Sequence, residues 1–186
     1  RRPVRVTVSS SFLQVFCVKD CTMIDLLPLE LPLKLVLVEP EIPPNVGAIS
    51  RICACIGAHL IVCGPYTFDE DHPKRKRAGL DYWDKVVKEY WPNFEAFAAQ
   101  HSGTCWLMST KVGKSLYNAR FSPGDALVFG PETRGLPSAL LARYESTSLR
   151  IPMQKNIRSL NVANAAAIAA YEAIRQIYGL GMQLER

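Results

Sequence analysis

Five short apolar runs recur along the chain and constrain its fold more than any other feature. The first is LKLVLVEP at 33–40, and the others are HLIVCG (59–64), TCWLMS (104–109), ALVFG (126–130) and SLRIP (148–152). A continuous aliphatic run that ends at a turn residue is typical of a strand buried on both faces, as in a parallel sheet. The runs therefore predict the strands of one buried sheet.

Helix-like segments separate these runs. Val46 to Gly57 places Ile49, Ile52 and Cys53 on one face at helical spacing. Strands that alternate with helices indicate an α/β fold with a largely parallel sheet. The other segments are 93–100, 137–144 and about 160–178.

The last of these helical segments, NVANAAAIAAYEAIRQIYG, is apolar nearly all the way round and rich in alanine. Small side chains let a neighbouring backbone approach closely. This helix is therefore expected in a core or in a contact between subunits.

The composition is that of one globular domain. The chain has 186 residues, of which 48% are apolar, enough for a substantial core. We place the domain at residues 33–180, with an N-terminal extension at 1–32 and a short tail at 181–186. No apolar run approaches the roughly 18–20 residues of a transmembrane helix.

The N-terminal extension differs from the rest of the chain. It carries four basic residues and no acidic one before Asp20, with serines clustered at 9–11. Such a composition is typical of an organelle transit segment or its remnant, although an extra strand or a cloned leader is the alternative. The first interpretation predicts a mitochondrial or plastid protein, and the second a cytoplasmic one.

Charge and cysteine content narrow the function only slightly. A net charge of +5 is compatible with a polyanionic partner without requiring one. The six cysteines lie mostly in apolar segments and form no CxxC pair, which argues against a zinc site. No pair of carboxylates or cluster of ligands indicates a metal, and none of the three histidines is assigned a role.

The loops after the strands carry the specific sequence signals. In parallel sheets, ligands bind in the loops at the carboxyl ends of the strands. Four such loops stand out by composition, namely EPEIPPNVGAISR, STKVGKS, GPETRGLP and IPMQKNIRSLNVAN.

The glycine loop FGPETRGLP (129–137) does not have the pattern of a phosphate-binding loop. A Walker A loop needs Lys and Ser/Thr where Leu136 and Pro137 stand. The dinucleotide fingerprint GxGxxG is also absent, and Pro131 removes a backbone N–H that a phosphate would use. A triphosphate or dinucleotide site is therefore not expected.

Read in order, IPPNVGAISR, STKVG, FGPETRGLP, IPM and RSLNVANAAAIAAYEA resemble the SPOUT superfamily of S-adenosylmethionine-dependent RNA methyltransferases. They are most similar to its small tRNA wobble-nucleotide (cytidine/uridine-34) 2'-O-methyltransferases, the TrmL type. The resemblance covers about Leu33 to Tyr178 and includes RAGLDYW at 77–83. It implies a C-terminal deep trefoil knot, a homodimer, S-adenosyl-L-methionine as methyl donor, no metal, and tRNA as partner.

The resemblance also implies the donor site. Adenine is flat and neutral, so apolar side chains and backbone groups suit it, and glycines leave room for backbone to approach. Glu132 can meet positive charge or order the neighbouring loop. The implied donor-binding residues are Met108, Gly130, Glu132, Gly135, Leu136, Ile151, Met153, Ser159 and Leu160.

A ribose 2'-hydroxyl is a weak nucleophile that needs positioning and a group to take or screen its proton. Arg51 is the candidate, and charge stabilisation suits it better than a role as base because of its high pKa. Asn45 is expected to cap the helix that starts near Val46 and so to position Arg51. The resemblance implies Asn45, Arg51, Ser159, Asn161 and Tyr171 as the catalytic group.

A basic run, Lys74-Arg75-Lys76-Arg77, is expected to contact RNA. Tyr82 and Trp83 follow closely, a combination suited to phosphate contact and base stacking. Charge runs are more often only solvated faces. The further candidates for RNA contact are Lys111, Lys114, Arg134, Lys155 and Arg158.

The sequence leaves other functions open. Ala48 stands where close relatives usually have Asn, and Ala163 where they have Ser, which leaves the methylated position open. The alternatives are 2'-O-methylation of rRNA or another tRNA position, a knotted RNA-binding protein without catalysis, and a small-molecule-binding α/β domain.

Overall fold

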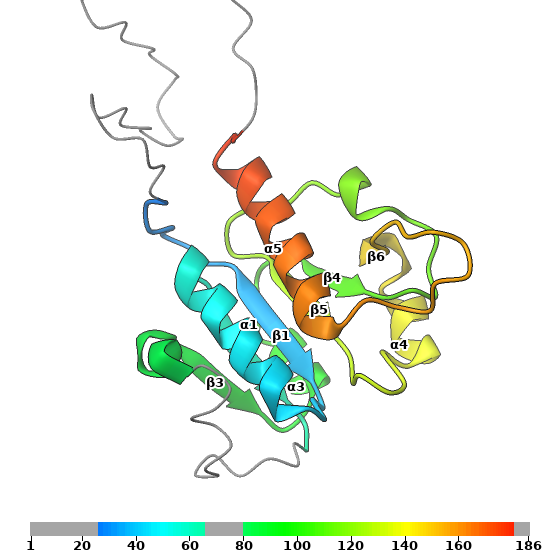
Figure 1. Ribbon diagram of the computed structural model, residues 1–186, viewed down its shortest axis with the longest axis horizontal. Coiled ribbons are helices and arrows are strands. Elements are labelled where there is room, and N and C mark those ends of the chain that lie inside the picture. The colour runs from blue at the N-terminus through cyan, green and yellow to red at the C-terminus, as the bar shows by residue number, and fades with distance from the viewer. Residues whose placement is uncertain (1–25, 66–79, 181–186) are drawn as a thin grey trace, which may run out of the picture.

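The computed structural model describes residues 26–65 and 80–180. In this part of the chain, six parallel strands form one sheet in the order β3-β2-β1-β5-β4-β6 (Figure 1). The strands are β1 (Lys34–Val38), β2 (His59–Cys63), β3 (Lys88–Trp91), β4 (Cys105–Met108), β5 (Ala126–Phe129) and β6 (Ser148–Leu149). The helices are α1 (Pro43–Ile56), α3 (Phe94–Ala98), α4 (Ser138–Arg143) and α5 (Val162–Ile177), with 3₁₀ helices η1 (Leu80–Lys85), η2 (Leu116–Asn118) and η3 (Glu145–Thr147).

The sheet is buried on both faces, as the aliphatic runs predict. Along β1, Leu35 and Leu37 join one apolar cluster while Val36 and Val38 join the other. This alternation follows from the two-residue period of a strand. The prediction of a parallel α/β sheet is confirmed.

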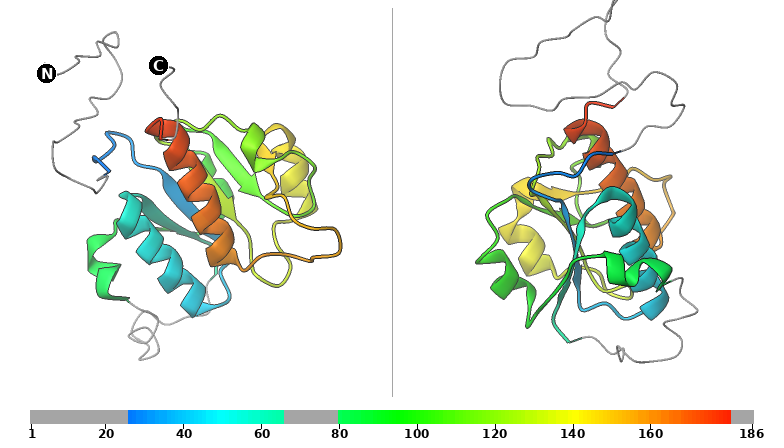
Figure 2. Two further views of the ribbon diagram at one scale, coloured as in Figure 1. Left: turned by 45° about the horizontal axis from the view of Figure 1, so that its top comes forward. Right: turned by 90° about the vertical axis from the view of Figure 1, so that its left-hand side faces the viewer.

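Helices cover both faces of this sheet (Figure 2). α1 and α5 pack on one face, and α3 and α4 on the other. The alanines of α5 that face the core, Ala166, Ala169 and Ala173, have no exposed surface. The expected burial of this helix is therefore confirmed on its inner side. Of the helices described, none has the length and apolar character needed to cross a membrane.

Two details differ from the sequence expectations. β3 has no apolar run because it is an edge strand, paired only with β2, and its residues Lys88–Trp91 are largely half-exposed. α1 starts at Pro43 and not near Val46, since two prolines fit the first turn of a helix, where no N–H donor is required.

Several sequence-level interpretations fall outside the described residues. They are the RNA contact expected for the basic run at 74–77 and the transit segment expected for residues 1–25. Both stay predictions. From Leu26 onward the extension lies against the domain, where the Tyr178 hydroxyl donates to the carbonyl of Leu27. The trefoil knot also stays a prediction.

Among the described cysteines, Cys53, Cys63 and Cys105 are buried free thiols and Cys55 is exposed. Burial raises the pKa of Cys63 to about 12 and that of Cys105 to about 11. Thiols with such pKa values carry almost no thiolate near neutral pH and are chemically inert.

Asp125 organises the amino ends of β4 and β5. Its side chain is buried and accepts hydrogen bonds from the backbone N–H of Thr104 (3.0 Å) and of Ser122 (2.9 Å). It also accepts one from the indole Nε1 of Trp106 at 2.8 Å. One carboxylate thus accepts hydrogen bonds from three donors at the amino ends of the strands.

Replacing Asp125 with Ala is expected to lower the free energy of unfolding by about 3 kcal/mol, because buried donors lose their acceptor. Urea denaturation measures this loss. The exposed Asp84 serves as control, and Asp84→Ala should change stability by no more than about 0.5 kcal/mol. Equal stability of the two variants would contradict the assigned role.

Candidate functional site

A cavity of about 410 Å³ opens at the carboxyl ends of β1, β4, β5 and β6. Because all strands are parallel, their following loops meet at this edge, beside the switch point where the chain leaves β1 for β2 and later returns to β5. The lining comes from four loops and the start of α5. Its residues are Ile42, Asn45, Met108–Lys111, Phe129–Gly135, Ile151, Met153, Arg158–Val162 and Ala165.

The glycine loop after β5 folds back tightly on itself. A Cβ atom at Gly130 would lie 2.5 Å from the backbone nitrogen of Leu136 and 2.7 Å from the carbonyl carbon of Gly135. Gly135 has φ +65°, in the left-handed region that favours glycine. Its N–H donates to the carbonyl of Pro131 at 2.8 Å. These two glycines therefore allow the bend that forms one cavity wall.

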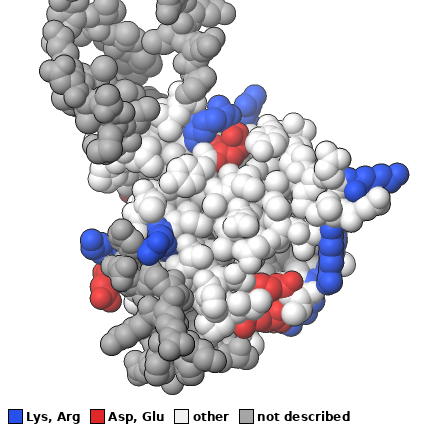
Figure 3. Space-filling model, viewed as in Figure 1, with Lys and Arg blue, Asp and Glu red and all other residues white. Residues whose placement is uncertain are grey.

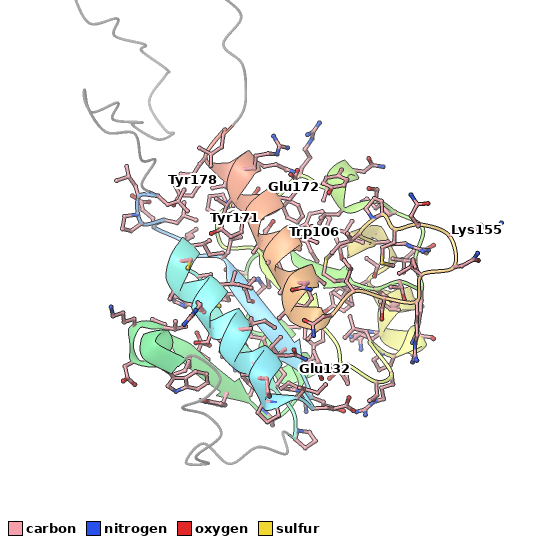
Figure 4. All side chains as sticks on the ribbon, viewed as in Figure 1. Trp106, Glu132, Lys155, Tyr171, Glu172 and Tyr178 are labelled. Carbon is pink, nitrogen blue, oxygen red and sulfur yellow. The ribbon has the colours of Figure 1, made fainter. Side chains whose placement is uncertain are left out.

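Glu132 joins this loop to the loop after β1. Its carboxylate accepts hydrogen bonds from the backbone N–H groups of Glu41 (2.9 Å) and Ile42 (3.3 Å) and from Nδ2 of Asn45 (2.9 Å). Figure 4 shows Glu132 beside the first turn of α1. A carboxylate at the N-terminus of a helix is also favoured by the helix dipole. Glu132 was expected either to meet positive charge or to order the neighbouring loop. These contacts show that it orders the neighbouring loop.

Asn45 extends this link to α5. Its Oδ1 accepts a hydrogen bond from Nδ2 of Asn161 at 3.0 Å, and Asn161 caps α5 through the N–H groups of Ala163 and Asn164. The expectation that Asn45 caps α1 is wrong. Ile42 holds the N-cap position because the helix starts three residues early, so the Asn45 side chain is available to bridge Glu132 and Asn161.

Arg134 is bound within the protein. Its guanidinium contacts Glu41 at 3.0 Å and also pairs with Glu39. Hydrogen bonds from the backbone and side chain of Thr133, together with the charge of Arg134, lower the pKa of Glu41. Arg134 therefore connects the same two loops that Glu132 connects. The sequence had suggested only a contact with RNA for this residue.

Lys111 brings in the loop after β4. Its Nζ donates to the carbonyl of Arg134 at 3.0 Å and to that of Leu136 at 3.2 Å. This ammonium group binds the carboxyl-terminal half of the glycine loop. Lys111 thus supports the cavity wall, and its expected contact with RNA stays a prediction.

The apolar wall contains most of the residues expected for it. Met108, Ile151, Met153 and Leu160 all line the cavity. Leu136 does not contribute its side chain, which is 1% exposed and packs in the core on the α3 and α4 side of the sheet. The tight bend brings Leu136 against Gly130 and turns this side chain inward, away from the cavity.

Two residues of the expected catalytic group lie elsewhere. Arg51 is exposed on α1, and Tyr171 is 51% exposed on α5, about 15 Å along the helix from Asn161. Neither lines the cavity of its own chain, whereas Asn45, Ser159 and Asn161 do. Trp83, expected to stack on a base, is buried in the core at 8% exposure.

The sequence reasoning missed several lining residues. Ser109, Thr110 and Pro131 come directly after strands, and their position at strand ends was the available signal. Glu41 carried no signal of its own, since its partners Thr133 and Arg134 are 92 and 93 residues away.

The cavity combines two chemical surfaces. Methionine and aliphatic side chains form one part, and backbone groups of the glycine loop, with Ser159 and Asn161, form the other. Such a mixture suits a flat, largely neutral ligand with a few polar groups.

A model of the SpoU rRNA Methylase family matches residues 32–171. The chain belongs to this family. It is 45% identical over 147 residues to the tRNA (cytidine(34)-2'-O)-methyltransferase of Aeromonas hydrophila, an alignment that covers 78% of this chain and 94% of the relative.

Solved structures show the same relationship. One described as giving structural insights into the 2-OH methylation of C/U34 on tRNA matches with a TM-score of 0.75 and 46% identity, over 80% of this chain and 98% of that one. The SpoU methyltransferase AviRb of Streptomyces viridochromogenes, in complex with AdoMet, matches with a TM-score of 0.68 and 27% identity, over 82% of this chain and 63% of that one.

Replacing Glu132 with Ala is expected to lower the free energy of unfolding by about 1–3 kcal/mol, because part-buried N–H donors lose their acceptor. Chemical denaturation measures the effect, and the exposed Glu30 provides a matched control in Glu30→Ala. A Glu132 variant as stable as this control would show that the link between the loops contributes little.

Proposed function

We propose that this protein transfers a methyl group from S-adenosylmethionine to the ribose 2'-hydroxyl of nucleotide 34, the wobble nucleotide of tRNA. The observation that carries the proposal is the 45% identity to a tRNA (cytidine(34)-2'-O)-methyltransferase over 94% of that relative's length. The family model, which matches residues 32–171, includes the four loops that build the cavity, so the likeness to the family extends to the site itself.

The cavity fits the proposed donor. Gly130 lines the cavity without a side chain, and Met108, Ile151, Met153 and Leu160 offer apolar contact to an adenine ring. Ser159 and Asn161 add polar groups for the ribose or amino-acid part. When bound, the donor supplies an electrophilic methyl group on a sulfonium centre.

A change at Gly130 should weaken donor binding, since a Cβ there would lie 2.5 Å from backbone. Gly130→Ala is expected to raise the dissociation constant for S-adenosylmethionine on the order of 10-fold, as overpacking costs about 1–3 kcal/mol. Isothermal titration calorimetry measures this constant.

Gly113→Ala is the matched control, because a Cβ at Gly113 meets nothing within 4 Å. Donor binding by this variant should equal that of the unchanged protein. Equal affinity of the Gly130 variant would rule out the glycine loop as a donor wall.

We propose a homodimer as the active form. The exposed side of the α1–α5 layer carries Ala48, Cys55, Ile168 and Tyr171, and Figure 3 shows few charged side chains over it. Arg51 lies on the same side of α1. A second copy on this face would bury the apolar residues and bring Arg51 and Tyr171 to the contact between subunits.

Arg51 is then proposed to serve the acceptor across this contact. An alkoxide that forms at the 2'-oxygen needs positive charge nearby, and a guanidinium keeps its charge at all relevant pH values. Arg51 does not reach the cavity of its own chain, so the dimer supplies a reason for its place on α1.

Replacing Arg51 with Ala is expected to reduce the rate of methyl transfer about 10²–10³-fold with little change in donor affinity, since the residue acts on the acceptor. Turnover with radiolabelled donor and calorimetry measure the two quantities. Arg143→Ala, on the opposite helical layer, should keep full activity. An unchanged rate in the Arg51 variant would remove it from the mechanism.

The function itself is tested by incubation with labelled S-adenosylmethionine and total RNA, followed by mapping of the modified nucleotide. We expect label in tRNA at the 2'-oxygen of nucleotide 34. Label in rRNA or at another tRNA position would keep the enzyme class and change the target, and the absence of label in any RNA would contradict the proposed activity.

A further inference from the structure

One edge of the molecule is basic over a long stretch of sequence. Residues 105–124 and 146–171 contain no Asp or Glu. The first segment contains β4, and the second contains β6 and the loop after it, so these parts lie at the same edge of the sheet, before the second segment continues into α5. Their basic residues are Lys111, Lys114, Arg120, Arg150, Lys155 and Arg158.

Hydrogen bonds hold the two segments together. The N–H of Leu116 donates to the carbonyl of Arg150 at 2.8 Å, and the N–H of Arg150 donates to the carbonyl of Lys114 at 2.7 Å. Ser115 and Arg150 also form an isolated bridge of parallel type. The cations of both segments therefore share one fixed surface.

A tight turn projects Lys155 from this surface. The N–H of Ile157 donates to the carbonyl of Gln154 at 3.2 Å, and Asn156 has φ +76°. A positive φ at the third residue is the geometry of a type II turn, which Asn tolerates better than most residues. Figure 4 shows Lys155 at the outermost part of this loop, pointing away from the body of the molecule.

Three cations of this surface differ from Arg134 and Arg175 in that no carboxylate in the described part of the chain pairs with them. Arg134 and Arg175 pair with carboxylates. Within residues 26–65 and 80–180, Arg150, Lys155 and Arg158 have no carboxylate partner. Their charge is not neutralised within the domain and can act on an anionic ligand.

An exposed aromatic ring stands beside these charges. Tyr117 is 55% exposed in η2, next to Leu116, which bonds Arg150. Flat rings among cations are the common pattern of surfaces that bind single-stranded nucleic acid, because the ring stacks on a base while the cations contact phosphates.

The surface leads into the cavity. Arg158 lines the cavity and lies three residues after Lys155, in the same loop as Met153 and Ser159. In Figure 3, the blue side chains at the right-hand margin lie over this loop. A strand that follows the cations would therefore reach the mouth of the cavity.

We propose that Tyr117, Arg150, Lys155 and Arg158, here named the basic edge, bind the RNA strand next to the nucleotide whose ribose enters the cavity. The inference rests on the proposed function and specifies where its substrate lies. The cations contact successive phosphates of a single-stranded loop, and Tyr117 stacks on one of its bases.

The salt dependence of RNA binding tests the phosphate contacts. The measurement is fluorescence anisotropy with a labelled anticodon stem-loop RNA at 50–200 mM salt. Each phosphate contact that is removed should lower the slope of log K against log salt by about 0.7, which makes the loss of affinity over this range about 3-fold smaller. Lys155→Gln and Arg150→Gln should each show this change, and their combination should show twice the change in slope.

Lys34→Gln is the matched control. It removes the same charge at the start of β1, at the end of the sheet opposite the cavity. Its salt slope should equal that of the unchanged protein. Calorimetry of S-adenosylmethionine without RNA should give the same donor affinity for Lys155→Gln and Arg150→Gln as for the unchanged protein, since neither residue lines the cavity.

The stacking contact is tested separately. Tyr117→Ala is expected to weaken RNA binding roughly 5- to 150-fold with an unchanged salt slope, because base stacking on an aromatic ring is lost and no charge is removed. Tyr117→Phe keeps the ring and should bind as the unchanged protein does.

The outcomes separate this inference from the proposed function. If the unchanged protein methylates tRNA while Lys155→Gln, Arg150→Gln and Tyr117→Ala bind RNA like the control, the basic edge is not the RNA surface and the function stands. If no RNA is methylated but the variants lose affinity and slope as described, the surface stands and the activity fails. Binding to phosphatidylserine vesicles with none to RNA would overturn the inference.

Discussion

The carboxylate of Glu132 is the interaction on which the rest of the site depends. It accepts from two backbone N–H groups after β1 and from Asn45, which in turn accepts from the residue that caps α5. The loop after β1 thereby meets the glycine loop, which lies about 90 residues later in the sequence, and the start of α5, which lies 116 residues later. Charged acceptors form stronger hydrogen bonds than neutral ones, so a carboxylate suits this central position. Without it, the loops after β1 and β5 would share the pairing of Arg134 with Glu39 and Glu41 and the hydrogen bonds from Thr133 to Glu41, all of which are exposed.

The same link explains the roles of the charged residues near the cavity. Arg134 and Lys111 bind carboxylates and carbonyl groups of neighbouring loops, so their charges stabilise the cavity wall. Within the described residues, the cations of the basic edge, Arg150, Lys155 and Arg158, have no carboxylate partner, which is why we propose them for the anionic substrate. The division follows from position, because a cation that lies between two loops finds protein acceptors, whereas one on an exposed turn does not.

Much of this arrangement could be predicted from the sequence. Buried strands leave long aliphatic runs, and helices leave a periodic apolar face, because burial acts on local segments. Met108, Gly130, Ile151, Met153 and Leu160 were predicted as site residues from the resemblance of their loops to the SPOUT superfamily, and all five line the cavity. β3 was missed because an edge strand is only half buried and leaves no such run.

The sequence by itself determined the parallel sheet, the family and the set of loops at the carboxyl ends of the strands, since each of these leaves a local pattern. Only the tertiary structure decided what each side chain touches. Asn45 bridges two segments and caps none, Leu136 turns into the core, and Arg51 and Tyr171 lie outside the cavity of their own chain. These outcomes depend on contacts between residues far apart in sequence. Such contacts are set by packing and hydrogen bonding in three dimensions and leave no signal in the local sequence.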